Sequence, residues 1–322
     1  MADGDRGSAR AGDGRNASGL VRATAPLNGG RPGRERADVT VVIATRDRRD
    51  QLLRTLGRLC ELPERPPIIV VDNASRDGGP DAVRRRFPEV RVVELPANRG
   101  ACARNVGVRR AGTPYVAFSD DDSWWEAGAL DTAARALDAH PRLALLVGRI
   151  RLAPDGRPDP VSRKMGTAPL GREDDLPGPS VLGFPACGAV VRRDAFLAVG
   201  GFDDLLFFGG EETLLALDLA AGDRGLAYLD TVHAWHDPHG AGHQSPERWA
   251  LQQRNDVLVT WMRLSPGRTA ARTWRLARAA VTDPAARGAL TALLRRLPAA
   301  LARRRRVPRA LEKQIAVLHE LQ

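Results

Sequence analysis

The segment Tyr115-Val116-Ala117-Phe118-Ser119-Asp120-Asp121-Asp122 decides the fold of this chain, because an apolar run leads directly into three carboxylates. The apolar half is typical of a strand in the interior of a sheet. Side chains alternate along an extended chain, so Asp120 and Asp122 are expected on one face and Asp121 on the other. Two carboxylates on one face suit Mg²⁺ or Mn²⁺, which prefer oxygen ligands. An acidic loop exposed to water is the alternative interpretation.

Three earlier apolar segments alternate with helical patterns. Strands are expected at residues 39–43, 68–71 and 90–95, with leucines at helical spacing after the first and a probable helix over residues 100–108. A helix through residues 130–137 and a fifth strand at residues 143–147 follow the aspartates. Near-continuous apolar strands with helical crossovers predict an α/β fold with a parallel sheet that is covered on both faces.

Polar side chains follow each of the four strands up to the aspartates. They are Thr45, Arg46 and Asp47, then Asp72 and Asn73, then Asn98, Arg99 and Gly100, and finally residues 120–122. In parallel α/β sheets ligands bind beyond the carboxyl ends of the strands, so these clusters are expected to converge on one crevice. The chain has neither a G-x-G-x-x-G after its first strand nor a G-x-x-x-x-G-K-[ST] motif, which argues against a dinucleotide site or a P-loop.

The second half of the chain is less regular. Residues 151–185 are rich in Gly, Pro and charge and predict a long irregular segment, with a further strand within residues 181–191. A helix is expected to begin near Glu211-Glu212 and to stop at Gly222. Acids are favoured in the first turn of a helix by its dipole, so a purely structural role is the alternative for this pair.

The 322 residues include 49 Lys or Arg and 39 Asp or Glu. Residues 263–322 hold 14 of the basic and 3 of the acidic residues, so the basic character belongs to the C-terminal segment. No apolar run is long enough to span a membrane, the first residues lack the apolar core of a signal peptide, and three scattered cysteines suit a reducing cytoplasm. Residues 1–37 show no periodicity and predict a disordered leader.

The C-terminal segment combines a leucine stripe with arginines. The leucines lie at 290, 293, 294, 297 and 301, are interrupted by Pro298, and are followed by four arginines at 303–306. A basic amphipathic segment of this kind can lie on an anionic membrane, or it can pack its leucines on the rest of the protein. Nucleic acid is not an expected partner, because aromatic residues are not interleaved with the charge.

Six segments in order resemble the family 2 glycosyltransferases, which are inverting, nucleotide-sugar-dependent enzymes with the GT-A fold. The resemblance runs from about Val39 to His236. It rests on residues 41–48, 71–78, 98–100, 103–107 and 120–122, and on Gly200-Gly201-Phe202-Asp203 followed by Gly210-Glu211-Glu212. It implies a GT-A (Rossmann-like), mostly parallel sheet flanked by helices, with a helical C-terminal extension.

The resemblance implies a role for each strand end in binding the donor. Thr45, Arg46 and Asp47 belong to the nucleotide loop, and Asp72 contacts the base. Asn98, Gly100 and Arg104 belong to the third signature, and Arg104 is suited to contact the diphosphate. Asp120 and Asp121 lie in the donor-binding DXD segment, and Asp120 and Asp122 would hold Mn²⁺ or Mg²⁺, which offsets charge on the leaving diphosphate.

The acceptor side of the resemblance supplies a base and a further metal ligand. Transfer to a hydroxyl needs a carboxylate base, which the family pattern places at Glu212, with Glu211 as the alternative. Histidines cluster at 233, 236, 239 and 243, and His236 fits best by position as a third metal ligand. The second acid is Glu where the family has Asp, so which of the pair is the base stays open.

The expected protein is a hexosyltransferase-type enzyme that moves a sugar from a nucleotide-diphosphate sugar to a saccharide, lipid-linked or small-molecule acceptor. Residues 38–245 would form the catalytic domain, with a nucleotide-sugar half at 38–122 and an acceptor half at 123–245. Residues 246–322 would form the basic helical extension. The expected location is cytoplasmic, with a peripheral site on the inner face of the membrane as a variant. A sugar nucleotidyltransferase and a non-catalytic, membrane-associated binding protein are the alternatives.

Overall fold

The computed structural model describes residues 38–238 and 245–320, which belong to one compact unit. The predicted disordered leader at residues 1–37 lies outside the described residues, as do His239 and His243. In the part of the chain that is described, no helix combines the length and apolar character needed to cross a lipid bilayer.

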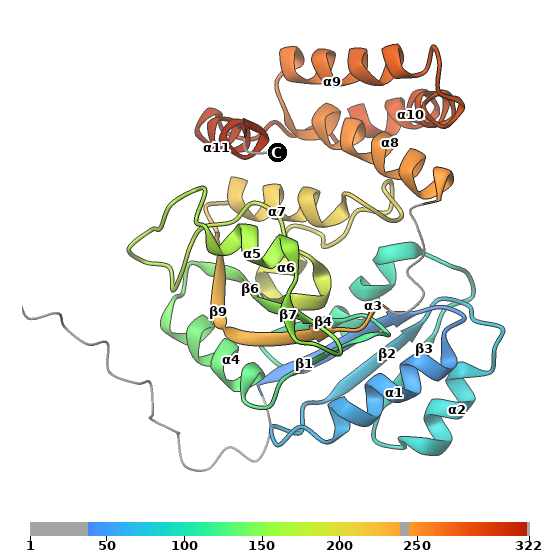
Figure 1. Cartoon of the computed structure of the whole chain (residues 1–322), viewed down its shortest axis with the longest axis vertical. Helices are drawn as coiled ribbons and strands as arrows, with labels where there is room; N and C mark the ends of the chain where they lie inside the picture. Colours follow the sequence, from blue (N-terminus) through green and yellow to red (C-terminus); the bar gives the residue numbers. More distant parts are fainter. Residues whose placement is uncertain (1–37, 239–244, 321–322) are drawn as a thin grey trace, which may run out of the picture. The chain divides into compact units, whose positions relative to one another are not determined.

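The elements alternate between strands and helices as far as β4 and then become more mixed (Figure 1). The strands are β1 (Val39–Thr45), β2 (Ile68–Asp72), β3 (Arg91–Glu94), β4 (Tyr115–Ser119), β5 (Ser123–Trp125), β6 (Leu143–Leu152), β7 (Arg157–Pro158), β8 (Ala189–Arg192) and β9 (Gly225–His236). The helices are α1 (Arg49–Cys60), α2 (Gly79–Arg86), α3 (Ala103–Arg110), α4 (Ala129–Ala139), α5 (Pro160–Gly166), α6 (Arg193–Ala198), α7 (Glu211–Ala221), α8 (Pro246–Arg263), α9 (Pro266–Ala279), α10 (Pro284–Ala302) and α11 (Arg309–Glu320). Short 3₁₀ helices, η1 (Gly100–Cys102) and η2 (Ala186–Gly188), precede α3 and β8.

The strands form one sheet in the order β3-β2-β1-β4-β8-β6-β9-β5, with β7 paired to β6. The pairs β3–β2, β2–β1 and β1–β4 are parallel, so β1, β2 and β4 all end at the same edge, as the sequence predicts. Beyond β4 the sheet is mixed, because β8 runs antiparallel to both β4 and β6, and β9 is parallel to β6. The first part of the sheet, from β3 to β4, therefore has the expected parallel layout, and the second part adds antiparallel strands.

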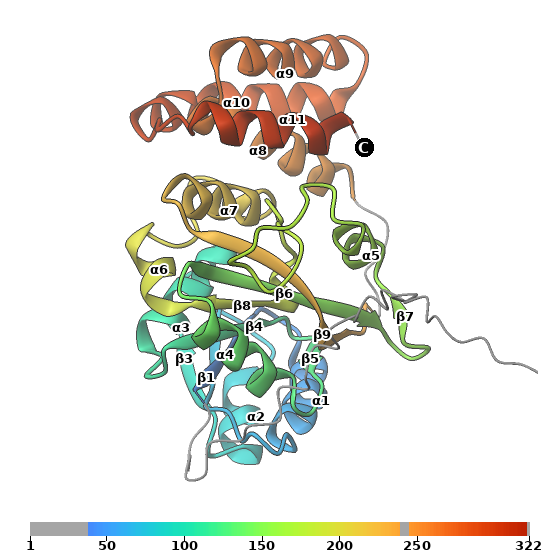
Figure 2. The same ribbon diagram turned by 90° about the vertical axis from the view of Figure 1, so that its left-hand side faces the viewer.

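Helices cover both faces of this sheet (Figure 2). One buried cluster joins strand residues to the leucines of α1 and α4, including Leu56 and Leu130. A second cluster on the other face joins the sheet to α3, α6 and α7, including Val106, Phe196 and Leu215. Because both faces are buried, β2 and β4 are buried along their full length, which explains their nearly continuous apolar sequence.

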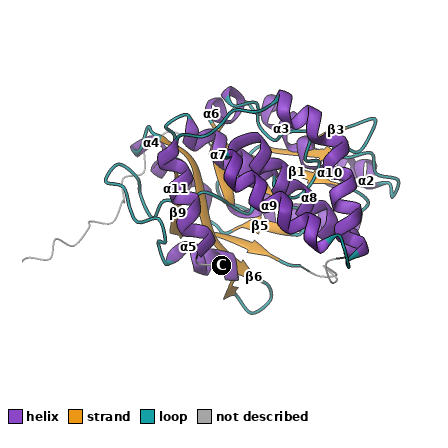
Figure 3. Cartoon of the chain, turned by 90° about the horizontal axis from the view of Figure 1, so that it is seen from above, coloured by secondary structure: helices purple, strands orange, loops and turns teal. Residues whose placement is uncertain are grey.

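Helix α7 lies between the sheet and the C-terminal helices. Figures 1 and 2 show α8–α11 together on the side of α7 that faces away from the sheet, and Figure 3 shows them from above. Its Leu215 and Leu219 belong to the cluster against the sheet. Its Leu214 and Leu217 belong to a third cluster with α8–α11. A helix that is apolar on two opposite sides is buried on both, so α7 joins the sheet to the C-terminal helices.

The C-terminal helices pack on the body, and the arginine run is largely engaged in contacts within the chain. Arg303 lies 2.6 Å from a carboxylate oxygen of Asp203. Arg304 donates to the backbone oxygens of Trp261 and Leu264. Of the leucine stripe, Leu293 is buried, whereas Leu294 and Leu301 are 57% and 45% exposed. The structure therefore favours packing for much of this segment.

Several elements differ from the sequence prediction. The segment predicted as irregular contains α5 and the short β7, and the strand predicted within residues 181–191 begins only at Ala189. Pro298 lies inside α10, which continues to Ala302. The 12-residue β9 has no counterpart in the prediction. Its alternation is broken by exposed residues near its middle, where the pairing with β6 shifts register.

Candidate active site

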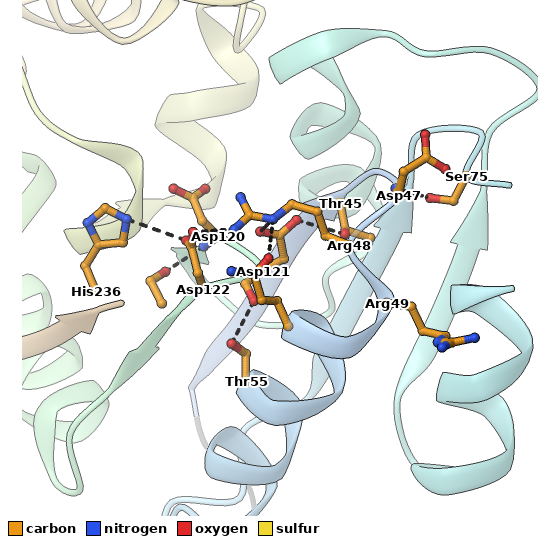
Figure 4. Close-up of polar contacts among 12 residues, drawn as sticks. Thr45, Asp47, Arg48, Arg49, Thr55, Ser75, Asp120, Asp121, Asp122 and His236 are labelled. Atoms are coloured by element: carbon orange, nitrogen blue, oxygen red, sulfur yellow. Dashed lines mark hydrogen bonds and ion pairs between the residues drawn. The ribbon is translucent and has the colours of Figure 1, made fainter. Parts of the chain in front are cut away.

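The three aspartates lie where β4 ends, beside the end of β1 (Figure 4). Asp121 and Asp122 are buried, and the side chain of Asp120 is 33% exposed. Asp121 Oδ2 accepts a 3.0 Å hydrogen bond from Thr45 Oγ1, and Thr55 Oγ1 donates to the backbone oxygen of Asp121 at 2.8 Å. Burial raises the pKa of Asp121 to about 6. The interpretation of residues 120–122 as an acidic loop exposed to water is therefore wrong.

Arg48 supplies positive charge to this cluster and is absent from the predicted site. Its Nη2 donates to Asp122 Oδ2 at 2.9 Å, and its Nε lies 3.3 Å from Asp121 Oδ1. The guanidinium thus spans two of the three carboxylates (Figure 4). Arg48 is the last residue of the matched segment 41–48, and that position is the only sequence signal that points to it.

His236 lies against Asp122, as expected for a further metal ligand. The antiparallel pairing of β5 with β9 puts Ser123 opposite His236, and His236 Nε2 is 3.5 Å from Asp122 Oδ1. The hydrogen bond to Asp122 raises the pKa of His236. Burial acts to raise the pKa of Asp122, but His236 and Arg48 outweigh it and lower that pKa. The neighbouring His233 instead contacts Glu126 and the backbone oxygen of residue 230.

The residues around Asp122 fit a metal ion that is partly held by substrate. Among residues 38–238 and 245–320, no three His, Cys, Asp or Glu side chains are grouped so that they could hold a metal by themselves. Asp122 and His236 nevertheless offer a carboxylate and an imidazole side by side, with Asp120 close by. Mg²⁺ is commonly held by one or two carboxylates together with substrate phosphates. The donor set therefore suits a metal whose remaining ligands come from a bound diphosphate.

Arg104 on α3 reaches the same cluster from the opposite side. Its Nη2 donates to Asp120 Oδ1, while its Nε is buried without a hydrogen-bond partner among the described residues. Burial acts to lower the pKa of Arg104, but the charges of Asp120, Glu212 and Glu211 outweigh it and raise that pKa. Arg104 is therefore a buried, charged guanidinium with a free donor, which suits an anionic group.

Asp72 at the end of β2 is prepared to accept a hydrogen bond. It is 3% exposed, and its Oδ2 accepts from the backbone nitrogen of Ser75 at 2.9 Å. Its Oδ1 is buried and has no partner in the described part of the chain. Such an oxygen is costly unless a ligand donates to it. Arg46 and Asp47 pair with each other at 3.2 Å on the exposed rim nearby.

Asn98 and Gly100 tie the third strand end to the loop before α7. Asn98 Oδ1 accepts from the backbone nitrogen of Gly100, and Asn73 Nδ2 donates to the Gly100 oxygen. Gly100 has a φ of +57°, and a Cβ there would lie 2.0 Å from the backbone oxygen of Phe207. Only glycine fits this contact. Gly100 therefore lets the backbone after the third strand pack closely against Phe207, which lies in the segment that leads to Glu211.

Glu211 and Glu212 begin α7, and their side chains have different surroundings. Glu211 is 3% exposed, and its Oε2 has no hydrogen-bond partner among the described residues. Glu212 Oε1 accepts from the backbone nitrogen of Ala186 at 2.7 Å, and the side chain lines a cavity of about 800 Å³. Burial, and then the charge of Glu211, raises the pKa of Glu212 to about 8. Burial also raises the pKa of Glu211.

The predicted residues are thus brought together at one edge of the sheet. Hydrogen bonds and ion pairs join Thr45 to Asp121, Arg104 to Asp120 and His236 to Asp122. The charges of Arg104 and Asp120 act on the pKa values of both glutamates, so α7 faces the same cluster. Arg46 and Asp47 alone remain at the exposed rim.

Solved glycosyltransferases share this architecture. A mannosyltransferase from Pyrobaculum calidifontis, solved with GDP-Man and Mn²⁺, aligns over 88% of this chain and 87% of its own at a TM-score of 0.56 and 21% identity. Staphylococcus aureus TarS residues 1–349, solved with UDP-GlcNAc, aligns over 82% and 81% at a TM-score of 0.56 and 18% identity. The fold is that of a GT-A glycosyltransferase, with a helical C-terminal region.

The profile of Glycosyl transferase family 2 matches residues 40–200. An N-acetylglucosaminyl-diphospho-decaprenol L-rhamnosyltransferase of Mycobacterium tuberculosis is 28% identical over 253 residues, covering 68% of this chain and 82% of its own. A pre-mycofactocin glycosyltransferase of the same organism is 31% identical over 212 residues, covering 64% and 44%. The chain belongs to glycosyl transferase family 2 and is a glycosyltransferase.

Proposed function

We propose that this chain is an inverting, metal-dependent enzyme that moves a sugar from a nucleotide-diphosphate sugar to an acceptor hydroxyl. The observation that carries the proposal is the cluster of Asp120, Asp122, Arg104 and His236 facing the start of α7. Solved structures with this fold bind GDP-Man or UDP-GlcNAc, and one contains Mn²⁺. Family membership favours sugar transfer over the alternatives of nucleotidyl transfer and non-catalytic binding.

The donor side is argued from buried groups without partners. The free Oδ1 of Asp72 would accept a hydrogen bond from the base, and Arg46, Asp47 and Thr45 would line the nucleotide next to it. The free Nε of Arg104 would donate to the diphosphate. Asn98 and Gly100 would hold the backbone that borders it. The donor would thus supply hydrogen-bond partners to Asp72 Oδ1 and Arg104 Nε, which have none among the described residues.

Mn²⁺ or Mg²⁺, bound through Asp122 and His236 and supported by Asp120, would supply Lewis-acid stabilisation of the leaving diphosphate. The chain's own residues prepare that position, because Arg48 neutralises Asp121 and Asp122 in the protein alone. A cation held by Asp122 would compete with Arg48 for this carboxylate. We therefore expect Arg48 to turn toward the phosphates when the donor binds.

Removal of Asp122 is expected to abolish the metal-dependent part of donor binding. A nucleotide diphosphate at about 100 times its Kd should stabilise the fold by about 2.7 kcal/mol, a shift of several degrees in Tm. We expect Mn²⁺ to enlarge the shift in the wild-type protein but not in Asp122→Ala. A screen of nucleoside diphosphates by thermal unfolding, with and without Mn²⁺, measures this.

The control for this prediction is Asp50→Ala, which removes a carboxylate that is 71% exposed on α1. This variant should keep the full Mn²⁺-dependent shift. An Asp122→Ala protein that keeps the shift as well would remove Asp122 from the metal site, and with it the proposed metal dependence.

We also propose that the C-terminal part, residues 246–322, attaches the catalytic part, residues 38–245, to an anionic membrane surface from the cytoplasmic side. Trp274 and Arg278 lie one turn apart on α9, and Val281 follows in the turn after this helix. The Trp274 and Val281 side chains are 69% and 76% exposed. Exposed apolar side chains next to arginines suit the interface of an anionic bilayer. The three cysteines are free, as expected in a reducing compartment.

Flotation with phosphatidylglycerol liposomes tests the membrane proposal. At low salt the wild-type protein is expected to float with the vesicles, and the Trp274→Ser, Val281→Ser double variant is expected to stay in the soluble fraction. Val161→Ser, which changes a 48% exposed valine on α5, is the control and should float normally. If the wild-type protein stays in the soluble fraction at low salt, the proposed binding of the C-terminal part to an anionic membrane is ruled out.

A further inference from the structure

The cavity beside Glu212 is built by parts of the chain that are far apart in sequence. Its walls come mainly from α5, residues 180–185, the first turns of α7, the middle of α8, one position on α9 and two on α11. The C-terminal helices therefore do more than pack against the body, because they close a space that opens onto Glu212. Glu211, by contrast, does not line this space.

The walls of the cavity are mostly apolar. Phe184, Leu217, Val259 and Ile315 contribute from four different elements. A volume of about 800 Å³ lies within the range of pockets that hold drug-sized ligands. Such a space suits a compact molecule with an apolar body better than a long lipid chain or a fully hydroxylated saccharide.

Polar groups interrupt this apolar surface at several places, among them Lys164 and Gln252. Asp256 on α8 and Arg272 on α9 both line the cavity, and the charge of Arg272 acts on the Asp256 carboxyl. Thr213 lies next to Glu212 in the same wall. A small number of placed polar groups in an apolar cavity fixes the orientation of a bound molecule.

We propose that this cavity binds the acceptor, and that the acceptor is a compact small molecule whose apolar body adjoins the hydroxyl that receives the sugar. The inference rests on the proposed function, because it takes Glu212 as the base that meets the acceptor hydroxyl. It assigns the C-terminal helices, together with α5, the selection of the acceptor.

Gly183 offers a way to fill the cavity without disturbing the fold. It lines the cavity, its φ is not in the left-handed region, and a Cβ built on it meets no atom within 4 Å. A phenylalanine there would extend into open space. Gly288 on α10 also has no atom within 4 Å of a built Cβ but does not line the cavity, so Gly288→Phe is the matched control.

The test is calorimetric titration with 2-naphthyl β-D-glucopyranoside and with methyl β-D-glucopyranoside, which carry the same sugar and differ in the apolar group. The naphthyl glucoside is expected to bind the wild-type protein saturably and at least about tenfold more tightly than the methyl glucoside. Gly183→Phe should weaken naphthyl glucoside binding by about tenfold or more, and Gly288→Phe should leave it unchanged.

Three results would overturn the inference: no saturable binding of the naphthyl glucoside, equal binding of the two glucosides, or equal binding by Gly183→Phe and wild-type protein. The Mn²⁺-dependent shift with nucleoside diphosphates, measured on the same proteins, should be unaffected by Gly183→Phe. If that shift is absent from every protein, the proposed function fails, whereas the glucoside titrations still decide the nature of the cavity.

Discussion

Replacement of Glu212 by Gln is expected to lower the rate of sugar transfer by about 10²–10⁴-fold, the usual contribution of a general base, while donor binding is kept. Gln keeps the oxygen that accepts from the Ala186 backbone nitrogen, so the local structure should survive. It cannot take a proton from the acceptor hydroxyl. Single-turnover transfer, together with the Mn²⁺-dependent thermal shift, separates the loss of chemistry from a loss of donor binding.

The pH profile identifies the group that is lost. Because the pKa of Glu212 is raised to about 8 in the folded protein, its basic form becomes scarcer as the pH falls below 8. The kcat/KM of the wild-type enzyme should therefore rise with pH up to about 8, and the residual activity of Glu212→Gln should lack this rise. In the folded protein Glu212 also keeps a proton that the unfolded chain loses near pH 4.5. The contribution of Glu212 to the free energy of unfolding is therefore full below about pH 4.5 and is lost as the pH rises through about 8.

Glu211→Gln is the companion variant for this prediction. It changes the buried neighbour that does not line the cavity, so it should keep a measurable pH-dependent rate. If Glu212→Gln transfers sugar at the wild-type rate and Glu211→Gln does not, the base is Glu211. If both variants transfer normally, neither glutamate is the base.

The substitution Arg263→Met is expected to lower the free energy of unfolding by about 3–5 kcal/mol, the usual cost of breaking a buried ion pair from one side. The Arg263 side chain is 2% exposed and pairs with Asp218 of α7, whose side chain is 13% exposed. Its Nη1 also donates to the backbone oxygen of Arg303 at 2.9 Å. The substitution removes the close partner of a largely buried carboxylate, which keeps only the exposed Arg305 at 3.8 Å, and it frees a contact that joins α7 to the C-terminal helices. Urea unfolding measures the loss.

Arg305→Ala is the matched control, because Arg305 lies 3.8 Å from the same carboxylate but its side chain is 69% exposed. Exposed pairs contribute little, so the change should stay within about 0.5 kcal/mol. Equal losses of unfolding free energy from the two variants would show that burial of the arginine does not determine how strongly its ion pair with Asp218 stabilises the fold.

The sequence predicts the donor half of the fold well because local patterns carry it. Strands β2 and β4 are buried along their full length and β1 nearly so, which makes their apolar runs easy to recognise, and parallel pairing brings their ends together. The start of α7 at Glu211 and its stop at Gly222 also follow from local signals. The convergence of Asp72, Arg104 and Asp120 follows from that topology.

The features missed by the sequence depend on contacts between distant segments. Arg48 is one of several arginines near the first strand, and nothing local shows that it pairs with a carboxylate 74 residues further along. Strand β9 is not predicted because its burial pattern changes where its pairing with β6 shifts register. The cavity is formed by α5, α7, α8 and α11 together, so no single sequence motif predicts it.

The two-sided burial of α7 bears on how enzymes of this design diverge. One side of the helix is held by the sheet that carries the donor residues, and the other by helices that wall the cavity. If the cavity binds the acceptor as proposed, exchange of the C-terminal helices is expected to change the recipient while the donor residues of the sheet stay as they are. A change within α7 itself has no such freedom, because it alters both partners of the reaction at once.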